Sequence, residues 1–148
     1  MTFRFSLESL LRLRRSIEER ERAALLAIVE EIARARSDLG AVERHQAEQA
    51  KNRWASLNEG ATGSDLHLAT ICENAAEQLR ALLAARIEKL RTTEEQRRRE
   101  WLDARREREI LDKVREQQYA AYCIEAARRE QAAADDLYLL RRSVPARR

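Results

Sequence analysis

The stretch Asn58-Glu59-Gly60-Ala61-Thr62-Gly63-Ser64-Asp65 decides the fold, because it holds two of the three glycines and helix-forming sequence lies on both sides of it. Glycine tolerates the positive φ that ends helices, and Asn58 suits a helix C-cap. Ser64 or Asp65 can accept hydrogen bonds from the first free N–H groups of a following helix. The stretch therefore predicts a tight turn at residues 58–65 between two helices.

The composition favours long helices over a globular core, since 37% of the residues are charged, 5% are aromatic and Pro145 is the only proline. We therefore predict an all-α fold, an antiparallel coiled-coil hairpin that forms a single domain over residues 1–148. The first helix is expected at about residues 6–57 and the second at about 66–142. A disordered tail is expected at 143–148, because proline cannot continue a helix.

Apolar residues recur at alternating steps of three and four in both predicted helices, which is the spacing of a coiled coil. Polar residues such as Arg14, Glu94 and Arg108 interrupt this pattern. The apolar positions are Leu7, Leu10, Ile17, Ala24, Ile28, Ala35 and Val42 in the first helix, and Leu83, Ile87, Leu90, Trp101, Ala104, Leu111 and Tyr122 in the second.

The position of the turn sets which residues of the two helices face each other. Folding back there pairs residues whose numbers add up to about 122, which places Leu39 near Leu83 and Leu10 near Leu111. The second helix is the longer one, so the sequence beyond about Gln118 has no partner in this register. This overhang carries apolar residues, and such residues on a single helix usually bind another surface. They are Tyr119, Tyr122, Ile124, Leu137, Tyr138, Leu139 and Leu140.

The charge pattern argues against a nucleic-acid ligand, because the net charge of +3 is spread among residues of alternating sign. Cys72 and Cys123 would lie roughly 75 Å apart on one helix, so they are expected to be unpaired thiols in a reducing compartment. The sequence has no apolar run of the kind that forms a signal peptide or a membrane span. These features predict a cytoplasmic protein.

The sequence contains no catalytic motif that we can identify. Its glycines do not match the spacing of a phosphate-binding loop, and His45, His67 and Cys72 do not match a zinc site. A two-helix fold also offers no dry pocket for catalysis. We therefore expect no enzyme activity, no cofactor and no metal. Trp101 fits the apolar seam, whereas Trp54 either packs beside the turn or anchors a partner.

Two segments of the sequence carry a further signal. The first is Phe3-Arg4-Phe5-Ser6-Leu7-Glu8-Ser9-Leu10-Leu11-Arg12-Leu13-Arg14, followed by Glu18. The second is Ala104-Arg105-Arg106-Glu107-Arg108-Glu109-Ile110-Leu111-Asp112-Lys113-Val114-Arg115-Glu116, followed by Glu125, Glu130-Gln131 and Asp135-Asp136. These segments resemble the ends of the flagellar FliJ family. The length, the order of the segments and the single hairpin are also similar to that family.

The resemblance implies a non-enzymatic stalk like the γ subunit of rotary ATPases. In that family the paired termini enter the hexameric export ATPase of the flagellar type III apparatus. They promote assembly of the hexamer and its hydrolysis of ATP. The stalk also connects the ATPase to the membrane export gate, and an escort role for export chaperones is attributed to it. The expected location is the cytoplasm, with peripheral association to the membrane export apparatus.

The residues expected at these interfaces fall into two groups. Contact with the ATPase ring is expected from the paired termini and the overhang, through Leu7, Leu10, Leu11, Arg14, Arg105, Arg106, Arg108, Tyr119 and Tyr122. Contact with the export gate is expected near the turn, through Trp54, Leu57, Leu66 and Leu68. Two alternatives stay open at this point, namely a stalk protein of an injectisome and a self-associating structural coiled coil.

Overall fold

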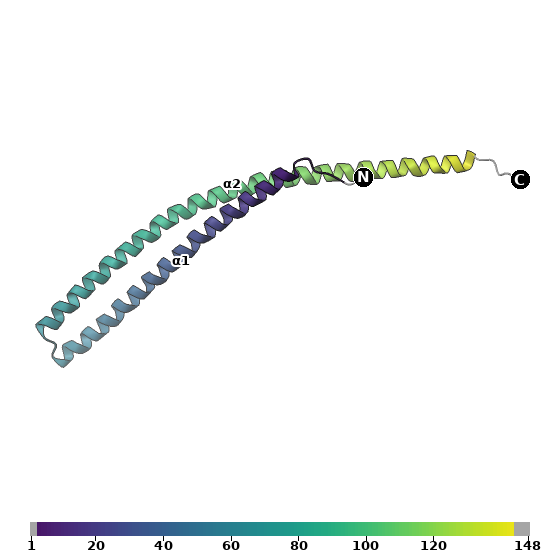
Figure 1. Ribbon diagram of the computed structural model, residues 1–148. Helices are drawn as coiled ribbons and strands as arrows, with labels where there is room; N and C mark the ends of the chain where they lie inside the picture. The colour runs from purple at the N-terminus through teal and green to yellow at the C-terminus, as the bar shows by residue number, and fades with distance from the viewer. Residues whose placement is uncertain (1–2, 144–148) are drawn as a thin grey trace. The chain divides into compact units, whose positions relative to one another are not determined.

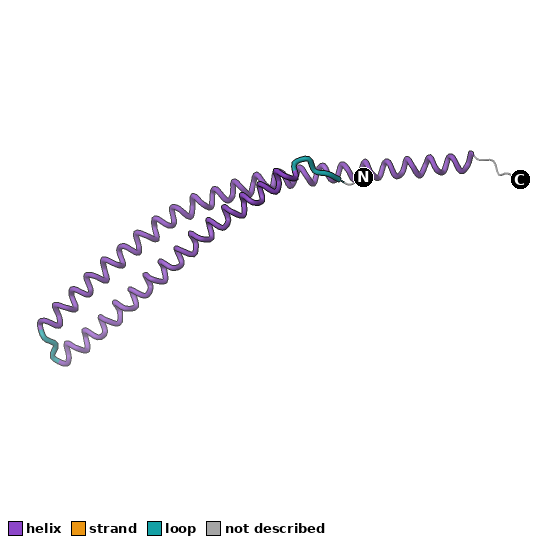
Figure 2. The backbone as a smooth tube through the Cα atoms, viewed as in Figure 1, coloured by secondary structure: helices purple, strands orange, loops and turns teal. Residues whose placement is uncertain are grey.

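The computed structural model describes residues 3–143, and these residues form two α-helices and no strand. Helix α1 comprises Glu8–Glu59 and helix α2 comprises Gly63–Ser143. A loop at residues 3–7 precedes α1, and a short turn at residues 60–62 reverses the chain (Figures 1 and 2). The prediction of an all-α antiparallel hairpin with a longer second helix is confirmed.

The helix bounds differ from the expected ones by a few residues. Helix α1 begins at Glu8 rather than near Ser6, and it continues to Glu59 instead of ending near Leu57. Helix α2 begins at Gly63, so the turn has three residues rather than eight. Ser143 is the last residue of α2, and the rest of the predicted tail lies outside the described residues.

A glycine in the left-handed region ends α1. Gly60 has a φ of 93°, and the N–H of Ala61 donates to the carbonyl of Ser56 at 3.0 Å. This bond spans five residues and closes a Schellman motif with Gly60 at the position after the C-cap. Glu59, not Asn58, is therefore the C-cap residue.

Thr62 caps the start of α2, whereas the sequence pointed to Ser64 or Asp65. The N–H of Asp65 donates to Thr62 Oγ1 at 3.3 Å, and the Asp65 carboxylate accepts the N–H of Thr62 at 3.0 Å. These reciprocal bonds form a capping box, in which Asp65 occupies the third position of the helix. Hydrogen bonds from Thr62 lower the pKa of Asp65, which keeps its negative charge at the positive end of the helix dipole.

Replacing Gly60 by alanine is expected to destabilise the hairpin by about 1 kcal/mol, because an L-residue is strained at this φ. Gly63 provides a matched control, since it lies in the first turn of α2 and a Cβ there would have no neighbour within 4 Å. Gly63→Ala is expected to be neutral or slightly stabilising. Urea unfolding followed by circular dichroism checks both values, and equal effects of the two changes would contradict the assignment.

Contacts divide the chain into two compact units. The turn unit is Glu19–Leu102, and the terminal unit consists of the described residues up to Glu18 and from Asp103 onward. Each unit has its own buried apolar side chains. They are Ile32, Ala35 and Ile87 in the turn unit, and Phe5, Leu11 and Ala104 in the terminal unit. The single domain over residues 1–148 stays a prediction.

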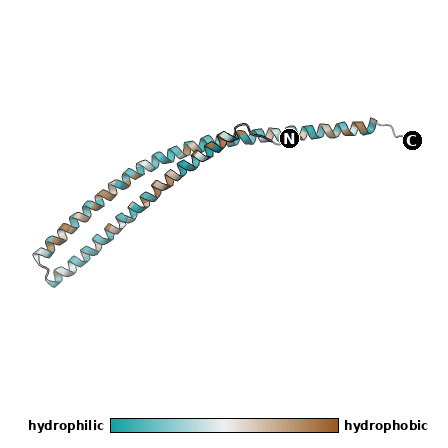
Figure 3. Cartoon of the chain, viewed as in Figure 1, coloured by the Kyte–Doolittle hydropathy of each residue, from teal (hydrophilic) through white to brown (hydrophobic). Residues whose placement is uncertain are grey.

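The seam of α2 follows the predicted spacing, but the seam of α1 starts one residue away from it. Leu11 is fully buried, whereas Leu7 and Leu10 are each 38% exposed. One line of buried and half-buried positions of α1 rises in steps of three and four through Leu11, Arg14, Glu18, Glu21, Leu25, Ile28, Ile32, Ala35 and Leu39. The predicted positions Ile17 and Ala24 are half-buried beside this line. After Leu11 the line continues with charged residues, and Figure 3 shows hydrophilic residues among hydrophobic ones along both helices. A search for apolar residues alone therefore finds one edge of the interface there and misses its charged positions.

Ion pairs between the helices define the register within each unit. Glu43 pairs with Arg80 at 3.3 Å in the turn unit, and Glu8 pairs with Arg115 at 3.7 Å in the terminal unit. The residue numbers of both pairs add up to 123, and those of five other ion pairs between the helices add up to values from 118 (Glu21 with Arg97) to 127 (Arg15 with Asp112). All of these sums lie within five of the predicted register of about 122.

Candidate functional site

Arg108 is the centre of an ion-pair cluster in the terminal unit. Its Nε donates to Glu18 Oε2 at 2.7 Å and its Nη1 donates to Asp112 Oδ2 at 2.8 Å. Arg15 donates to the other Asp112 oxygen at 3.0 Å. The side chains of Glu18, Arg108 and Asp112 are only 19%, 24% and 25% exposed. This Arg108 cluster (Arg15, Glu18, Arg108 and Asp112) thus joins the start of α1 to α2 by charge-assisted bonds.

Hydrogen bonds within the cluster shift the pKa values of Arg108 and Asp112. Hydrogen bonds to Glu18 and Asp112 raise the pKa of Arg108 further above its ordinary value. The hydrogen bond from Arg108 lowers the pKa of Asp112, against a smaller opposing effect of burial, and Arg15 lowers this pKa further. Arg105, one turn before Glu109, lowers the pKa of Glu109 in the same way. Arg108, Asp112 and Glu109 therefore stay ionised at neutral pH.

The lowered pKa of Asp112 predicts an acid-sensitive contribution to stability. Because the pKa is lower in the folded chain, this contribution is present above the ordinary value of about 3.9 and is lost as the pH falls through the folded value. Asp112→Asn is expected to cost about 1 kcal/mol at pH 7. Urea unfolding of both proteins between about pH 7 and pH 3 checks this, since their difference should shrink below about pH 4.

Asp103 offers a matched control for this measurement, because its side chain is 71% exposed and has one ion pair, with Arg106 at 3.4 Å. Asp103→Asn is expected to change stability by less than about 0.5 kcal/mol. A wild-type to Asp112→Asn difference that stayed constant down to pH 3 would contradict the role given to the Asp112 carboxylate.

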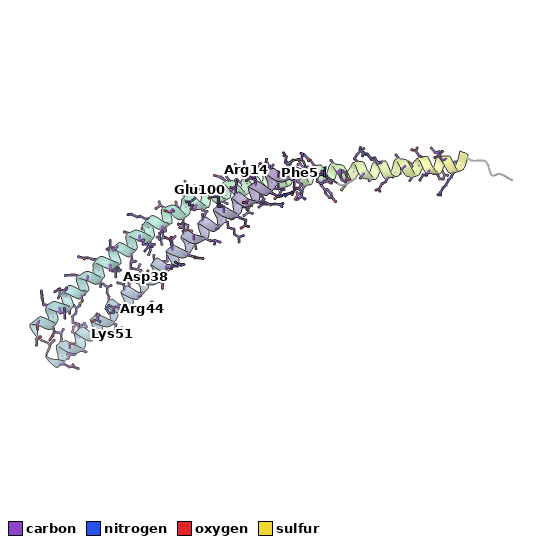
Figure 4. All side chains as sticks on the ribbon, in the orientation of Figure 1. Phe5, Arg14, Asp38, Arg44, Lys51 and Glu100 are labelled. Carbon is purple, nitrogen blue, oxygen red and sulfur yellow. The ribbon has the colours of Figure 1, made fainter. Side chains whose placement is uncertain are left out.

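The N-terminal loop extends the contact between the chain ends beyond the predicted limit. The ring of Phe3 lies 5.3 Å from that of Tyr119 and 5.6 Å from that of Tyr122, measured between centroids. Phe5 is buried in the same unit, and Figure 4 labels it near the start of the chain. The overhang was expected from about Gln118, but Phe3 partly covers α2 as far as Tyr122.

The residues expected at the ATPase ring all lie in the terminal unit, but their exposure differs. Leu7, Leu10 and Tyr119 are exposed, and so are Arg105 and Arg106, while Tyr122 is half-buried. Three others hold the two helices together. Leu11 is fully buried, Arg108 belongs to its cluster, and Arg14, labelled in Figure 4, pairs with Glu107. Leu11, Arg14 and Arg108 therefore support the exposed residues by holding α1 and α2 together.

Helix α2 is a single exposed helix past Tyr122. Every residue from Cys123 to Arg142 is exposed except Ala126, which is half-buried. Large apolar side chains are among them, namely Ile124, Leu137, Tyr138, Leu139 and Leu140. The side chain of Cys123 hydrogen bonds to Tyr119 and raises the pKa of that phenol, which therefore stays neutral. We call Cys123–Arg142 the bare segment.

The residues expected at the export gate lie in the turn unit and are all exposed. Trp54, at 72% exposed, does not pack beside the turn. Leu57, Leu66 and Leu68 are also exposed. Three more exposed apolar residues follow on α2 in this unit, namely Ile71, Leu79 and Leu82. The sequence analysis missed these three because they lie outside the turn.

A groove of about 280 Å³ lies beside the turn in the same unit. His45 and Cys72 both line it, next to the ion pair between Arg53 and Glu73 at 2.7 Å. Among the described residues, no three His, Cys, Asp or Glu side chains come together in a way that could hold a metal ion. No metal-binding role is therefore assigned to His45 or Cys72 in this groove.

No stretch of the described helices has the apolar length that a membrane span requires. No curated protein and no solved structure matches the chain. A protein-family model described as "Flagellar FliJ protein" matches residues 3–145, which is nearly the whole sequence. The chain therefore belongs to the flagellar FliJ protein family, whose members are associated with the flagellar export apparatus.

Proposed function

We propose that the chain is the central stalk of the flagellar type III export ATPase. Its terminal unit enters the hexameric ATPase ring and promotes ring assembly and ATP hydrolysis. The exposed residues beside the turn contact the export gate in the membrane, and an escort role for export chaperones belongs to the same proposal. The chain itself performs no catalysis. It works in the cytoplasm, at the membrane export apparatus.

The observation that carries this proposal is the bare segment. Hydrophobic side chains that remain exposed over five turns of one helix favour a protein partner. Membership of the FliJ family indicates that this partner belongs to the flagellar export apparatus. A passive ligand changes ATPase activity only by binding one conformation of the ring more tightly than another. The stalk is therefore expected to stimulate hydrolysis through differential binding.

The proposal assigns different tasks to the residues of the terminal unit. Direct contact with the ring is given to exposed or half-buried side chains of the same terminal unit, namely Leu7, Leu10, Arg105, Arg106, Tyr119 and Tyr122. Leu11, Arg14 and Arg108 position that surface. Contact with the gate is given to Trp54, Leu57, Leu66 and Leu68.

The experiment is ATP hydrolysis by the export ATPase of the same bacterium, with and without the purified chain, together with a binding assay for the hexamer. Stimulation that saturates near one chain per ring is the expected result. Absence of both binding and stimulation would contradict the proposal and would favour a self-associated scaffold instead. Stimulation of an injectisome ATPase, but not of the flagellar one, would favour an injectisome stalk.

A further inference from the structure

One face of the bare segment has a charge pattern that is complementary to itself. Ile124, Arg128, Gln131 and Asp135 fall within about 60° of the helix circumference, because each residue turns the helix by about 100°. Together with Ala127 and Ala132 they line a shallow depression on α2. All six side chains are exposed. The face thus has a cation, Arg128, near one end, an anion, Asp135, near the other and the small residue Ala132 between them.

We propose that this face pairs with the same face of a second copy of the chain, in antiparallel orientation. The two-fold axis passes between Gln131 and Ala132. Arg128 of each copy then lies opposite Asp135 of the other, and Ile124 lies opposite Leu139. Leu139 is on the same side of the helix and is 61% exposed. Two ion pairs and two apolar contacts form at once, as a two-fold interface requires.

The charges favour this orientation over the alternatives. Parallel pairing in register would place Arg128 beside Arg128 and Asp135 beside Asp135, which is repulsive. In the antiparallel arrangement the small side chain of Ala132 faces Gln131, so the helices can approach closely. Arg129 lies about 100° further round the helix and pairs with Glu125 of its own chain at 3.1 Å. Its charge therefore takes no part in the interface.

The paired length from Ile124 to Leu139 is about 24 Å, which buries a small area, so the dimer is expected to be reversible in the micromolar range. The inference does not depend on the stalk role. A reversible pair would cover these apolar residues in the free chain and would release them to a stronger partner. Sedimentation of the chain alone and ATPase stimulation therefore test separate claims.

The test is sedimentation velocity of the full chain between about 1 and 100 µM, where we expect a shift from monomer to dimer. Arg128→Asp places an acid opposite Asp135 at both ion-pair positions of the dimer and is expected to weaken the dimer by about tenfold or more. Asp135→Arg should have the same effect for the opposite reason. An equimolar mixture of the two variants is expected to dimerise again, because each new charge then meets its opposite. Arg129→Asp is the matched control and should leave the dimer unchanged.

Cross-linking tests the orientation. In a background with Cys72→Ser and Cys123→Ser, Gln131→Cys is expected to form a disulfide-linked dimer on oxidation, because it lies beside the axis. Leu139→Cys is expected to remain monomeric under oxidation, since its own counterpart lies about 24 Å away. Cross-linking at both positions would overturn the antiparallel arrangement. A chain that stays monomeric throughout the concentration range, or a mixture that does not recover, would overturn the proposal.

Discussion

Leu11→Ala is expected to destabilise the terminal unit by about 3 kcal/mol, within the range of about 2 to 5 kcal/mol that buried leucines show. Leu11 is the only large side chain with no exposed surface in the described part of the chain. Its unit buries little else, namely Phe5 and Ala104. The cavity left by the change therefore has few neighbours that could refill it, and the loss is a large share of what holds the start of α1 to α2.

Urea unfolding and amide hydrogen exchange measure this effect. The exchange data are expected to show faster exchange in residues 8–18, because a subglobal opening there becomes easier. Leu13→Ala is the matched control, since Leu13 is two residues away and 54% exposed. This control should change stability by less than about 1 kcal/mol. Similar losses of stability for the two variants would contradict the placement of Leu11 in the core. They would indicate instead that Leu11 lies on the exposed surface.

The fold could be predicted because the signals for it are local. Two glycines in one stretch, helix-forming sequence on both sides and apolar residues at coiled-coil spacing were sufficient for the hairpin and its register. The ends of the helices were less accessible, since the capping box uses Thr62 and Asp65 in roles that several neighbours could fill. Such a choice depends on backbone geometry, which propensity alone does not determine.

The first positions after Leu11 on the α1 seam could not be found from apolar residues, because these positions are charged. They are Arg14, Glu18 and Glu21. Glu18 faces Arg108 at 2.7 Å, and Glu21 faces Arg97 at 3.8 Å. On its own helix, each of these charged residues interrupts the apolar pattern. Across the pair the charges are complementary, so a polar layer stands where an apolar one was expected. The Glu18 carboxylate accepts hydrogen bonds from Arg108 of the other helix.

The candidate surfaces were predicted in position but not in detail. The sequence placed an uncovered apolar end on α2, and the structure leaves residues exposed there. It could not separate Leu10 from Leu11, since adjacent leucines differ only in the direction in which the helix turns them. Nor could it foresee that Phe3 would reach Tyr119 and Tyr122, because a contact between chain ends depends on the register of the whole hairpin.

Ending the chain after Tyr122 is expected to reduce stimulation of the export ATPase to the unstimulated rate, with little change in the stability of the hairpin. The truncation removes the bare segment, which carries the proposed stalk function. It keeps Tyr119 and Tyr122 with the ring of Phe3, and it keeps the Arg108 cluster. Residues 123–142 among them are exposed except for half-buried Ala126, so few packing contacts disappear with that segment.

A second truncation, after Arg142, separates the bare segment from the residues that follow it. It is expected to stimulate hydrolysis as the full chain does, since the helix through Arg142 remains. Urea unfolding of both truncated chains shows whether the hairpin is intact, so a loss of stimulation cannot be mistaken for unfolding. If the chain ending at Tyr122 still stimulated hydrolysis fully, the bare segment would have no part in activation. Contact with the ring would then be assigned to the surface of the paired helices around Leu7, Leu10 and Arg106. Single alanine substitutions at these residues would test that assignment.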